Sequence, residues 1–168
     1  MKVLFLDRDG VINCDIGYLH EINKAKFVDG IFEFCKYFQD KGFKLIIVTN
    51  QSGIGRNYFS EEDFKILSNW MLRKFLEKGI HILDIFYCPH APVDNCNCRK
   101  PKSGLFIDAI RKFQIEIDQS WSIGDNERDI TASISAGVKK NILLSNKNHP
   151  DTQAMYVLKS LKNINNIF

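Results

Sequence analysis

The most constraining feature of the chain is a short apolar run that ends directly in two aspartates. Residues 3–6 read Val-Leu-Phe-Leu, and Asp7 and Asp9 follow with one residue between them. Four apolar residues in a row are typical of a strand buried on both faces of a parallel sheet. Ligands of open α/β sheets bind at the carboxyl edge, where both aspartates would lie. Two hypotheses stay open here: a Mg²⁺-dependent aspartate nucleophile, or a strand followed by a solvated turn.

Length and composition predict an ordinary globular protein with one domain over residues 1–168. Apolar residues make up 45% of the chain and charged residues 26%. The formal charge is only +3 and no block of Lys or Arg stands out, so we expect no nucleic-acid partner. No apolar stretch is long enough to span a bilayer, and no leader pattern precedes the first strand. We therefore expect a cytoplasmic monomer that acts on a small molecule and does not bind membranes.

Strand and helix patterns alternate along the chain. Further strands are predicted at residues 44–48, 80–87, 121–123, 140–144 and 155–158. Helices are predicted at residues 30–41, 60–78, 103–113 and 128–136, the second and third capped by Ser60 and Ser103. The alternation predicts an α/β fold with a parallel sheet flanked by helices. Residues 13–27 form a long polar and aromatic loop, and loops of this length are often functional.

Four predicted strands lead into polar side chains that would meet at one edge of the sheet. These are Asp7 and Asp9, Thr49 and Asn50, Asp125, and the basic cluster Arg99, Lys100 and Lys102. Carboxylates are the ligands that Mg²⁺ prefers, whereas basic groups and a hydroxyl bind phosphate oxygens. Convergence of four strand ends argues against the solvated turn and favours a phosphate-handling metal site.

A second metal site is predicted in one loop. Cys88, His90, Cys96 and Cys98 follow the pattern C-x-H-x5-C-x-C. Residues two apart in an extended segment point to the same side, so each pair can hold one ion. Three thiolates and one imidazole are typical of a structural Zn²⁺ site. The alternatives are bystander side chains or a disulfide, and a cytosolic location argues against the disulfide.

These motifs resemble those of the haloacid dehalogenase (HAD) superfamily. The matching residues are Asp7-Arg8-Asp9-Gly10, Thr49-Asn50, Lys100, and Gly124-Asp125 with Asp129. More narrowly, residues 5–13, 17–21, 48–54, 87–90 and 96–101 resemble the heptose bisphosphate phosphatases, which carry zinc at the same loop positions. The resemblance spans nearly the whole chain and implies a Rossmann-like HAD fold with a zinc-binding loop. No segment is long enough for a cap domain, so we expect an open cleft.

The resemblance implies a role for each acid. Asp7 would attack phosphorus to give an aspartyl-phosphate. Asp9 would protonate the leaving oxygen and later accept a proton from water. Mg²⁺ would be bound by the Asp7 and Asp125 side chains and by the backbone carbonyl of Asp9. Asp129 is interpreted as an acid that supports this site rather than an ordinary first-turn acid.

Further residues would hold the substrate. Thr49 and Lys100 would stabilise the transferring phosphoryl group, with Lys102 as the competitor for the Lys100 role. Arg99 would bind a second anionic group, and Asn50 would fix its own turn. The substrate contacts expected in addition to Arg99 and Lys100 are Asp15, Gly17, Tyr18, Gln51 and Ser52.

The implied reaction is removal of the 7-phosphate of a heptose 1,7-bisphosphate to give heptose 1-phosphate, for nucleotide-activated heptose. Hydrolysis of histidinol phosphate is the nearest alternative, and a non-catalytic, zinc-organised binding module is the alternative of another class. Asn126 stands where many relatives have a basic residue, which removes one expected contact. The sequence leaves open the anomer at C1, and with it the choice between ADP-heptose and GDP-heptose.

Overall fold

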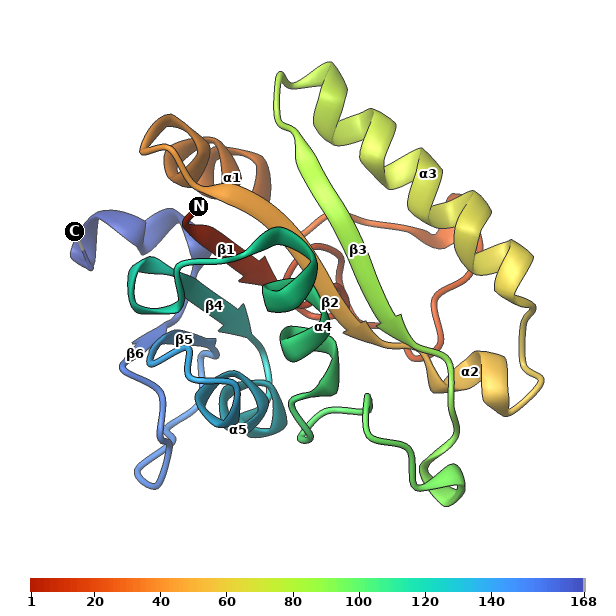
Figure 1. The fold of residues 1–168 in the computed structure, drawn as a ribbon. Helices are drawn as coiled ribbons and strands as arrows, with labels where there is room; N and C mark the ends of the chain where they lie inside the picture. Colours follow the sequence, from red (N-terminus) through yellow and green to blue (C-terminus); the bar gives the residue numbers. More distant parts are fainter. Residues whose placement is uncertain (168) are drawn as a thin grey trace.

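A parallel sheet forms the centre of the molecule. The structure, a computed structural model, describes residues 1–167, and within them the sheet has six strands in the order β3-β2-β1-β4-β5-β6 (Figure 1). The strands are β1 Val3–Leu6, β2 Lys44–Asn50, β3 Ile82–Cys88, β4 Trp121–Gly124, β5 Lys140–Leu144 and β6 Tyr156–Leu158. The predicted parallel sheet is confirmed, and β1 lies in its middle. Phe168, the end of the predicted domain, lies outside the described residues.

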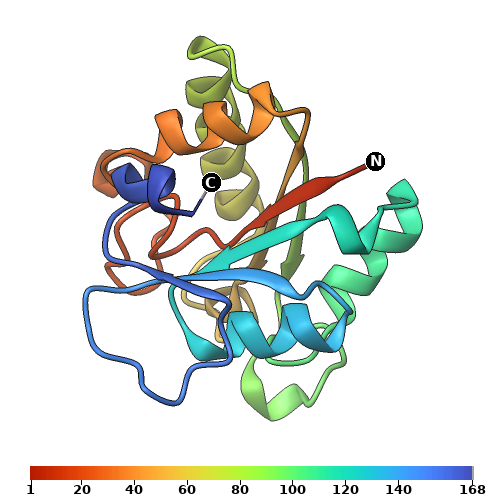
Figure 2. The same cartoon turned by 90° about the vertical axis from the view of Figure 1, so that its left-hand side faces the viewer.

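Helices cover both faces of the sheet. Helices α1 Ile31–Asp40 and α3 Glu61–Glu77 pack on one face with the terminal turn η4 Leu161–Asn166 (Figure 2). Helices α4 Gly104–Phe113 and α5 Glu127–Ser135 cover the other face. The short helix α2 Ser52–Gly55 was not predicted from the sequence, and short turns occur at η1 Ile22–Lys24, η2 Pro92–Asp94 and η3 Ile117–Gln119.

Strand β1 joins the two layers of the core. Leu4 and Leu6 belong to the apolar cluster under α1 and α3, whereas Val3 and Phe5 belong to the cluster under α4. Side chains alternate between the faces of a strand, so an entirely apolar strand requires cover on both sides. This burial places the first polar residue, Asp7, at the carboxyl edge of the central strand.

The two predicted helix caps have different outcomes. Ser60 Oγ accepts a hydrogen bond from Asp63 N at 3.0 Å, and Ser60 N donates to Asp63 Oδ2 at 2.9 Å, which makes a capping box. Ser103 occupies the N-cap position of α4, but its side chain makes no capping hydrogen bond, so that part of the prediction is wrong.

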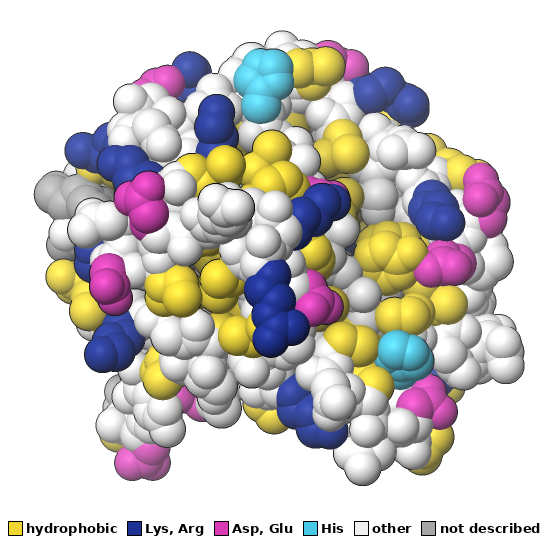
Figure 3. Space-filling model, in the orientation of Figure 1, with side chains coloured by type: hydrophobic (Ala, Val, Ile, Leu, Met, Phe, Trp, Pro, Cys, Tyr) yellow, Lys and Arg dark blue, Asp and Glu magenta, His cyan; other side chains and the backbone are white. Residues whose placement is uncertain are grey.

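The connections that leave the carboxyl edge consist of loops and helices. Between β1 and β2 lie the loop of residues 13–27 and α1, and between β2 and β3 lie α2 and α3. This is compatible with the predicted lack of a cap domain. Among residues 1–167, no helix has the length and apolarity to cross a membrane. Figure 3 shows Lys and Arg side chains interspersed with Asp and Glu over one face of the molecule.

Candidate active site and metal sites

Three carboxylates meet where β1 and β4 end. Asp7 follows β1, Asp125 follows β4, and Asp129 lies in the first turn of α5. Asp7 N donates to Ile123 O at 3.0 Å, which keeps the ends of the two strands together. Carboxylate oxygens of the three aspartates lie within 4.8 Å of one another. We call these three residues the acid cluster.

Two glycines allow the acid cluster to form. A Cβ atom at Gly10 would lie 2.0 Å from Asp125 Oδ2, and Gly10 has a φ of +90°, a conformation that favours glycine. A Cβ atom at Gly124 would lie 2.2 Å from Asp129 Cβ. Any larger residue at either position would displace a carboxylate of the cluster.

Lys100 is the cation that contacts the acid cluster. Its Nζ lies 2.9 Å from Asp7 Oδ1 and 2.8 Å from Asp129 Oδ1, and it donates to Val48 O at 2.8 Å. Burial alone would lower the pKa of Lys100, but the Asp129 and Asp7 carboxylates together hold that pKa above its usual value. Lys102 Nζ instead donates to Asn95 Oδ1 and Cys96 O. The structure therefore places Lys100, and not its competitor, beside Asp7.

The acid cluster fits a divalent cation. Burial raises the pKa of Asp7 to about 7, with Asp129 and Asp9 adding to the shift and Lys100 opposing it. Burial and the Asp129 carboxylate also raise the pKa of Asp125 to about 6. Three carboxylates against one ammonium leave excess negative charge in a partly dry site. Oxygen donors in this arrangement are the ligand set of a hard cation such as Mg²⁺.

The side chain of Asp9 points away from the acid cluster. Its carboxylate accepts hydrogen bonds from Arg8, Asn13 and Gln51. Only the backbone of Asp9 is left for the metal, as the resemblance implies, and that contact stays a prediction.

Residues at the end of β2 organise the phosphate side of the site. Thr49 is buried, and its Oγ1 accepts from Gln51 Nε2 at 2.9 Å. Asn50 Nδ2 donates to Lys100 O at 3.1 Å, and Lys100 N donates to Asn50 Oδ1 at 3.0 Å. Asn50 is expected from the sequence to fix its own turn, but its side chain makes both of these hydrogen bonds to another segment. Asn50 binds the backbone of Lys100, fifty residues away in the sequence.

An open cleft of about 310 Å³ lies beside Asp9. The cleft is lined by six of the predicted substrate contacts, namely Asp15, Gly17, Tyr18, Gln51, Ser52 and Arg99. The seventh, Lys100, is buried and does not line it. Sequence reasoning missed Arg8, Arg56 and Arg128, which also line it. Arg56 and Arg128 belong to no basic cluster in the sequence, so no spacing signal marks them. The surplus of guanidinium groups favours an anionic ligand.

The loop of residues 13–27 is held against the segment that joins α2 to α3. The Tyr18 ring meets the Tyr58 ring edge-on at 4.8 Å, and His20 stacks on Phe59 at 5.0 Å. Gly17 N donates to Asp15 Oδ1 at 2.9 Å, which tightens the turn. Leu19 is buried in the core, whereas Tyr18 is exposed and lines the cleft.

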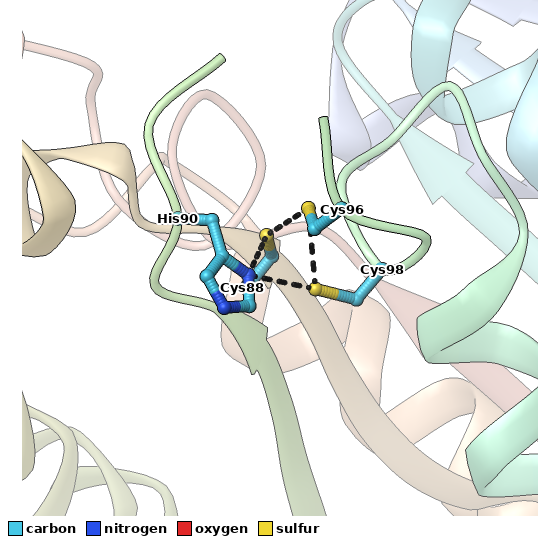
Figure 4. A group of neighbouring side chains, drawn as sticks. All are labelled: Cys88, His90, Cys96 and Cys98. Atoms are coloured by element: carbon cyan, nitrogen blue, oxygen red, sulfur yellow. Dashed lines mark hydrogen bonds between the residues drawn. The ribbon is translucent and has the colours of Figure 1, made fainter. Parts of the chain in front are cut away.

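The four predicted zinc ligands surround one point (Figure 4). We call Cys88, His90, Cys96 and Cys98 the thiol cluster. The Sγ atom of Cys96 lies 3.5 Å from the Sγ atoms of both Cys88 and Cys98. His90 Nδ1 lies 3.5 Å from Cys88 Sγ and 3.2 Å from Cys98 Sγ. Zn–S bonds of about 2.3 Å in a tetrahedron place sulfur atoms about 3.8 Å apart, so small shifts admit an ion. All three cysteines are free thiols, which excludes the disulfide alternative in this structure.

The thiols of the cluster differ in acidity. Burial raises the pKa of Cys88. Burial would also raise the pKa of Cys96, but hydrogen bonds from the Arg99 backbone and from the other two thiols lower it to about 6. The loop continues from Cys98 into Arg99 and Lys100, so its position sets theirs. Arg99 Nη1 is buried and has no hydrogen-bond partner among the described residues.

Asn126 and Asp129 serve the start of α5. Asn126 Oδ1 accepts from Arg128 N, and Asn126 N donates to Asp129 Oδ2 at 3.1 Å. Asp129 is thus held by the helix start and by Lys100 at once, which supports its interpretation as more than a first-turn acid. Position 126 is used as a cap, and the nearby cation that lines the cleft is Arg128.

Comparison with known proteins places this geometry in context. The model of the haloacid dehalogenase-like hydrolases matches residues 2–137. A D-glycero-alpha-D-manno-heptose-1,7-bisphosphate 7-phosphatase from Campylobacter jejuni is 42% identical over 99% of this chain and 95% of its own. A D-glycero-beta-D-manno-heptose-1,7-bisphosphate 7-phosphatase from Haemophilus influenzae is 44% identical over 85% of this chain and 81% of its own.

A solved structure gives the same fold. The D,D-heptose 1,7-bisphosphate phosphatase from B. bronchiseptica, complexed with magnesium and phosphate, superposes with a TM-score of 0.85. It is 27% identical and covers 96% of this chain and 94% of its own.

Proposed function

Because the chain belongs to the haloacid dehalogenase-like hydrolases, we propose that it is a Mg²⁺-dependent phosphatase that removes the 7-phosphate of D-glycero-D-manno-heptose 1,7-bisphosphate. The observation that carries the proposal is the contact of buried Lys100 with Asp7 and Asp129, next to a cleft lined by arginines. Relatives named for this activity match the chain over most of its length.

The residues of the site suit two successive phosphoryl transfers. When bound, Mg²⁺ would be held by Asp7, Asp125 and the Asp9 backbone and would reduce the repulsion between carboxylate and phosphate. Asp7 attacks phosphorus and forms the aspartyl-phosphate while Asp9 protonates the leaving sugar oxygen. A water then attacks the aspartyl-phosphate and gives a proton to Asp9. Thr49 and Lys100 stabilise the negative charge on the phosphoryl oxygens in both steps.

The thiol cluster holds a structural Zn²⁺. Its four donors match the closed shell of structural zinc sites and leave no position for substrate. The ion fixes the segment that carries Arg99 and Lys100. A heptose 1,7-bisphosphate has a second phosphate, and Arg99 with its unpartnered Nη1 is suited to receive it. A cytoplasmic location and a monomeric state stay predictions from the sequence.

Phosphate release from three esters tests the function. We expect the purified protein with Mg²⁺ to hydrolyse one anomer of the heptose bisphosphate far faster than histidinol phosphate. The product should be heptose 1-phosphate, identified by ³¹P NMR. Faster hydrolysis of histidinol phosphate would move the chain to the alternative substrate. Absence of hydrolysis of all three esters would favour the non-catalytic module. The preferred anomer decides between the ADP-heptose and GDP-heptose routes.

A further inference from the structure

The carboxylate of Asp9 has no free acceptor position. Arg8 Nε donates to Oδ2 at 3.1 Å and Arg8 Nη2 donates to Oδ1 at 3.0 Å. Asn13 Nδ2 donates to Oδ1 at 3.0 Å, and Gln51 Nε2 donates to Oδ2 at 3.1 Å. A carboxylate has about four in-plane acceptor sites, and four donor groups fill them here. In this arrangement Asp9 cannot contact a leaving oxygen until one donor moves.

The guanidinium of Arg8 is buried, and the charge that it faces is the Asp9 carboxylate. The Arg8 side chain is 3% exposed, in a position where an unpaired charge is costly. Its Nη2 also donates to Leu19 O at 3.0 Å, and its guanidinium lies 5.8 Å from the centre of the Phe64 ring. The planar fork binds both Asp9 oxygens at once and so fixes the plane of the carboxyl group.

Gln51 and Asn13 each have a second acceptor, Thr49 Oγ1 and Cys14 O, but Asn13 is fully buried whereas Gln51 lines the cleft. Gln51 is therefore the donor best able to leave toward a substrate. Its Nε2 has a second acceptor, Thr49 Oγ1 at 2.9 Å, so it keeps a hydrogen bond when it releases Asp9. Arg8 Nε has Asp9 as its hydrogen-bond acceptor. Arg8, Asp9 and Gln51 all line the substrate cleft. Substrate that draws the Gln51 amide toward itself would uncover Asp9 Oδ2 on the cleft side.

We propose that Arg8 is the positioning residue that holds the Asp9 carboxyl plane for proton transfer, and that Gln51 occupies the place of the leaving oxygen until substrate binds. The proposal rests on the proposed phosphatase function. When Gln51 has left, Asp9 Oδ2 takes up a proton from solvent. In the first step Asp7 Oδ then bonds to phosphorus, the bond from phosphorus to the sugar oxygen breaks with its electron pair on that oxygen, and Asp9 Oδ2 gives its proton to the same oxygen. In the second step water bonds to phosphorus, the Asp7–phosphorus bond breaks, and the water proton returns to Asp9 Oδ2.

Two ester classes separate positioning from general damage. A sugar phosphate needs a proton on its leaving oxygen, whereas 4-nitrophenyl phosphate releases a stable anion without one. We expect Arg8→Met to lower kcat/KM for the sugar phosphate by about 100-fold, the scale of lost general acid catalysis. The same variant should lower kcat/KM for 4-nitrophenyl phosphate by less than about 3-fold. The control Arg73→Met, at an exposed position of α3, should change neither value.

Arg8→Lys guards against misfolding of Arg8→Met, because it keeps the charge but loses the fork. We expect it to change the ratio of the two kcat/KM values in the same direction by a smaller factor. Equal losses on both esters in folded Arg8→Lys, or no loss on either, would overturn the positioning role. Wild-type protein that hydrolyses another alkyl phosphate but not the heptose bisphosphate would overturn only the proposed function, and the ratio would then be measured with that ester. Wild-type protein that hydrolyses no alkyl phosphate would overturn both.

Discussion

The acid cluster and the thiol cluster both suit a metal ion, but the chain builds them in opposite ways. The acid cluster joins residues from two strand ends and a helix start, and Lys100 reaches it from a fourth segment. The thiol cluster comes from one short segment, residues 88–98, which begins at the last residue of β3. The acid cluster rests on the sheet, whereas three members of the thiol cluster lie in the loop after β3, whose Val93 side chain is largely exposed.

The two clusters differ in what a bound ion would contribute. Two strand ends and the start of α5 place the acid cluster, and Lys100 neutralises part of its charge. The thiol cluster contains no Lys or Arg, and Cys96 and Cys98 are only partly buried beside the core, whereas Cys88 is fully buried. We therefore expect Mg²⁺ to serve chemistry and Zn²⁺ to serve the fold of the loop.

Asp7→Asn should have the largest effect on catalysis and almost none on the fold. Removal of the nucleophile should lower kcat by at least about 10³-fold. The melting temperature should stay equal or rise, because the buried charge at the acid cluster is lost. Steady-state assays and thermal melting measure the two effects. Asp118→Asn, at an exposed position, is the control, and undiminished turnover in Asp7→Asn would refute the nucleophile assignment.

Loss of the thiol cluster should act first on the stability of the fold. Cys96→Ser, or removal of zinc by a chelator, should lower the melting temperature by about 10 °C, since structural zinc contributes several kcal/mol to folding. Activity should fall with it because Arg99 and Lys100 lose their support. Zinc content by mass spectrometry and thermal melting check this result. Cys14→Ser removes a free thiol outside the cluster and should lower neither the melting temperature nor the activity. An unchanged melting temperature after removal of zinc would refute a structural role for the ion.

Asn50→Ala tests whether Lys100 must be held from β2. The variant loses two hydrogen bonds to the Lys100 backbone and should lower kcat/KM about 10-fold through misplacement of the ammonium. Gln39→Ala is a matched control, because Gln39 also makes two hydrogen bonds to distant backbone, at Gly79 and His81. Both variants should lose about 1–2 kcal/mol of stability, but only Asn50→Ala should lose activity. Equal activity in both would contradict a role for Asn50 at the site.

The smallest effect concerns pH. The pKa of Asp7 is raised to about 7 from 3.8. Between these two pH values the folded protein therefore holds a proton on Asp7 that the unfolded chain has lost. The resulting contribution to stability is complete below pH 3.8 and is lost as pH rises through about 7. The melting temperature of metal-free wild-type protein should therefore be a few degrees lower at pH 8 than at pH 6, after the change that Asp7→Asn shows between the same two pH values is subtracted. Mg²⁺ should remove most of this difference between pH 6 and pH 8. A melting temperature that changes neither with pH nor with Mg²⁺ would count against a cation at the acid cluster.

Local patterns made much of the molecule predictable. Every predicted strand and helix is present, because the alternation of apolar periods is a property of neighbouring residues. The short helix α2 was missed because Ser-Gly-Ile-Gly has no apolar period and two poor helix formers. Residues 88–98 carried the whole thiol cluster in their spacing, and the order of polar residues after the strands located the acid cluster.

The parallel sheet, the edge that carries the acids and the four members of the thiol cluster were therefore predictable, since each depends on residues close in the chain. Which side chains meet across that edge depends instead on contacts between distant segments. Strand register and loop path selected Lys100 over Lys102, attached Asn50 to the Lys100 backbone, and brought Arg56 and Arg128 to one cleft. Strand register and loop path also turned the Asp9 carboxylate toward Arg8 and Gln51. Arg8 is its neighbour in the sequence, whereas Gln51 comes from a distant segment.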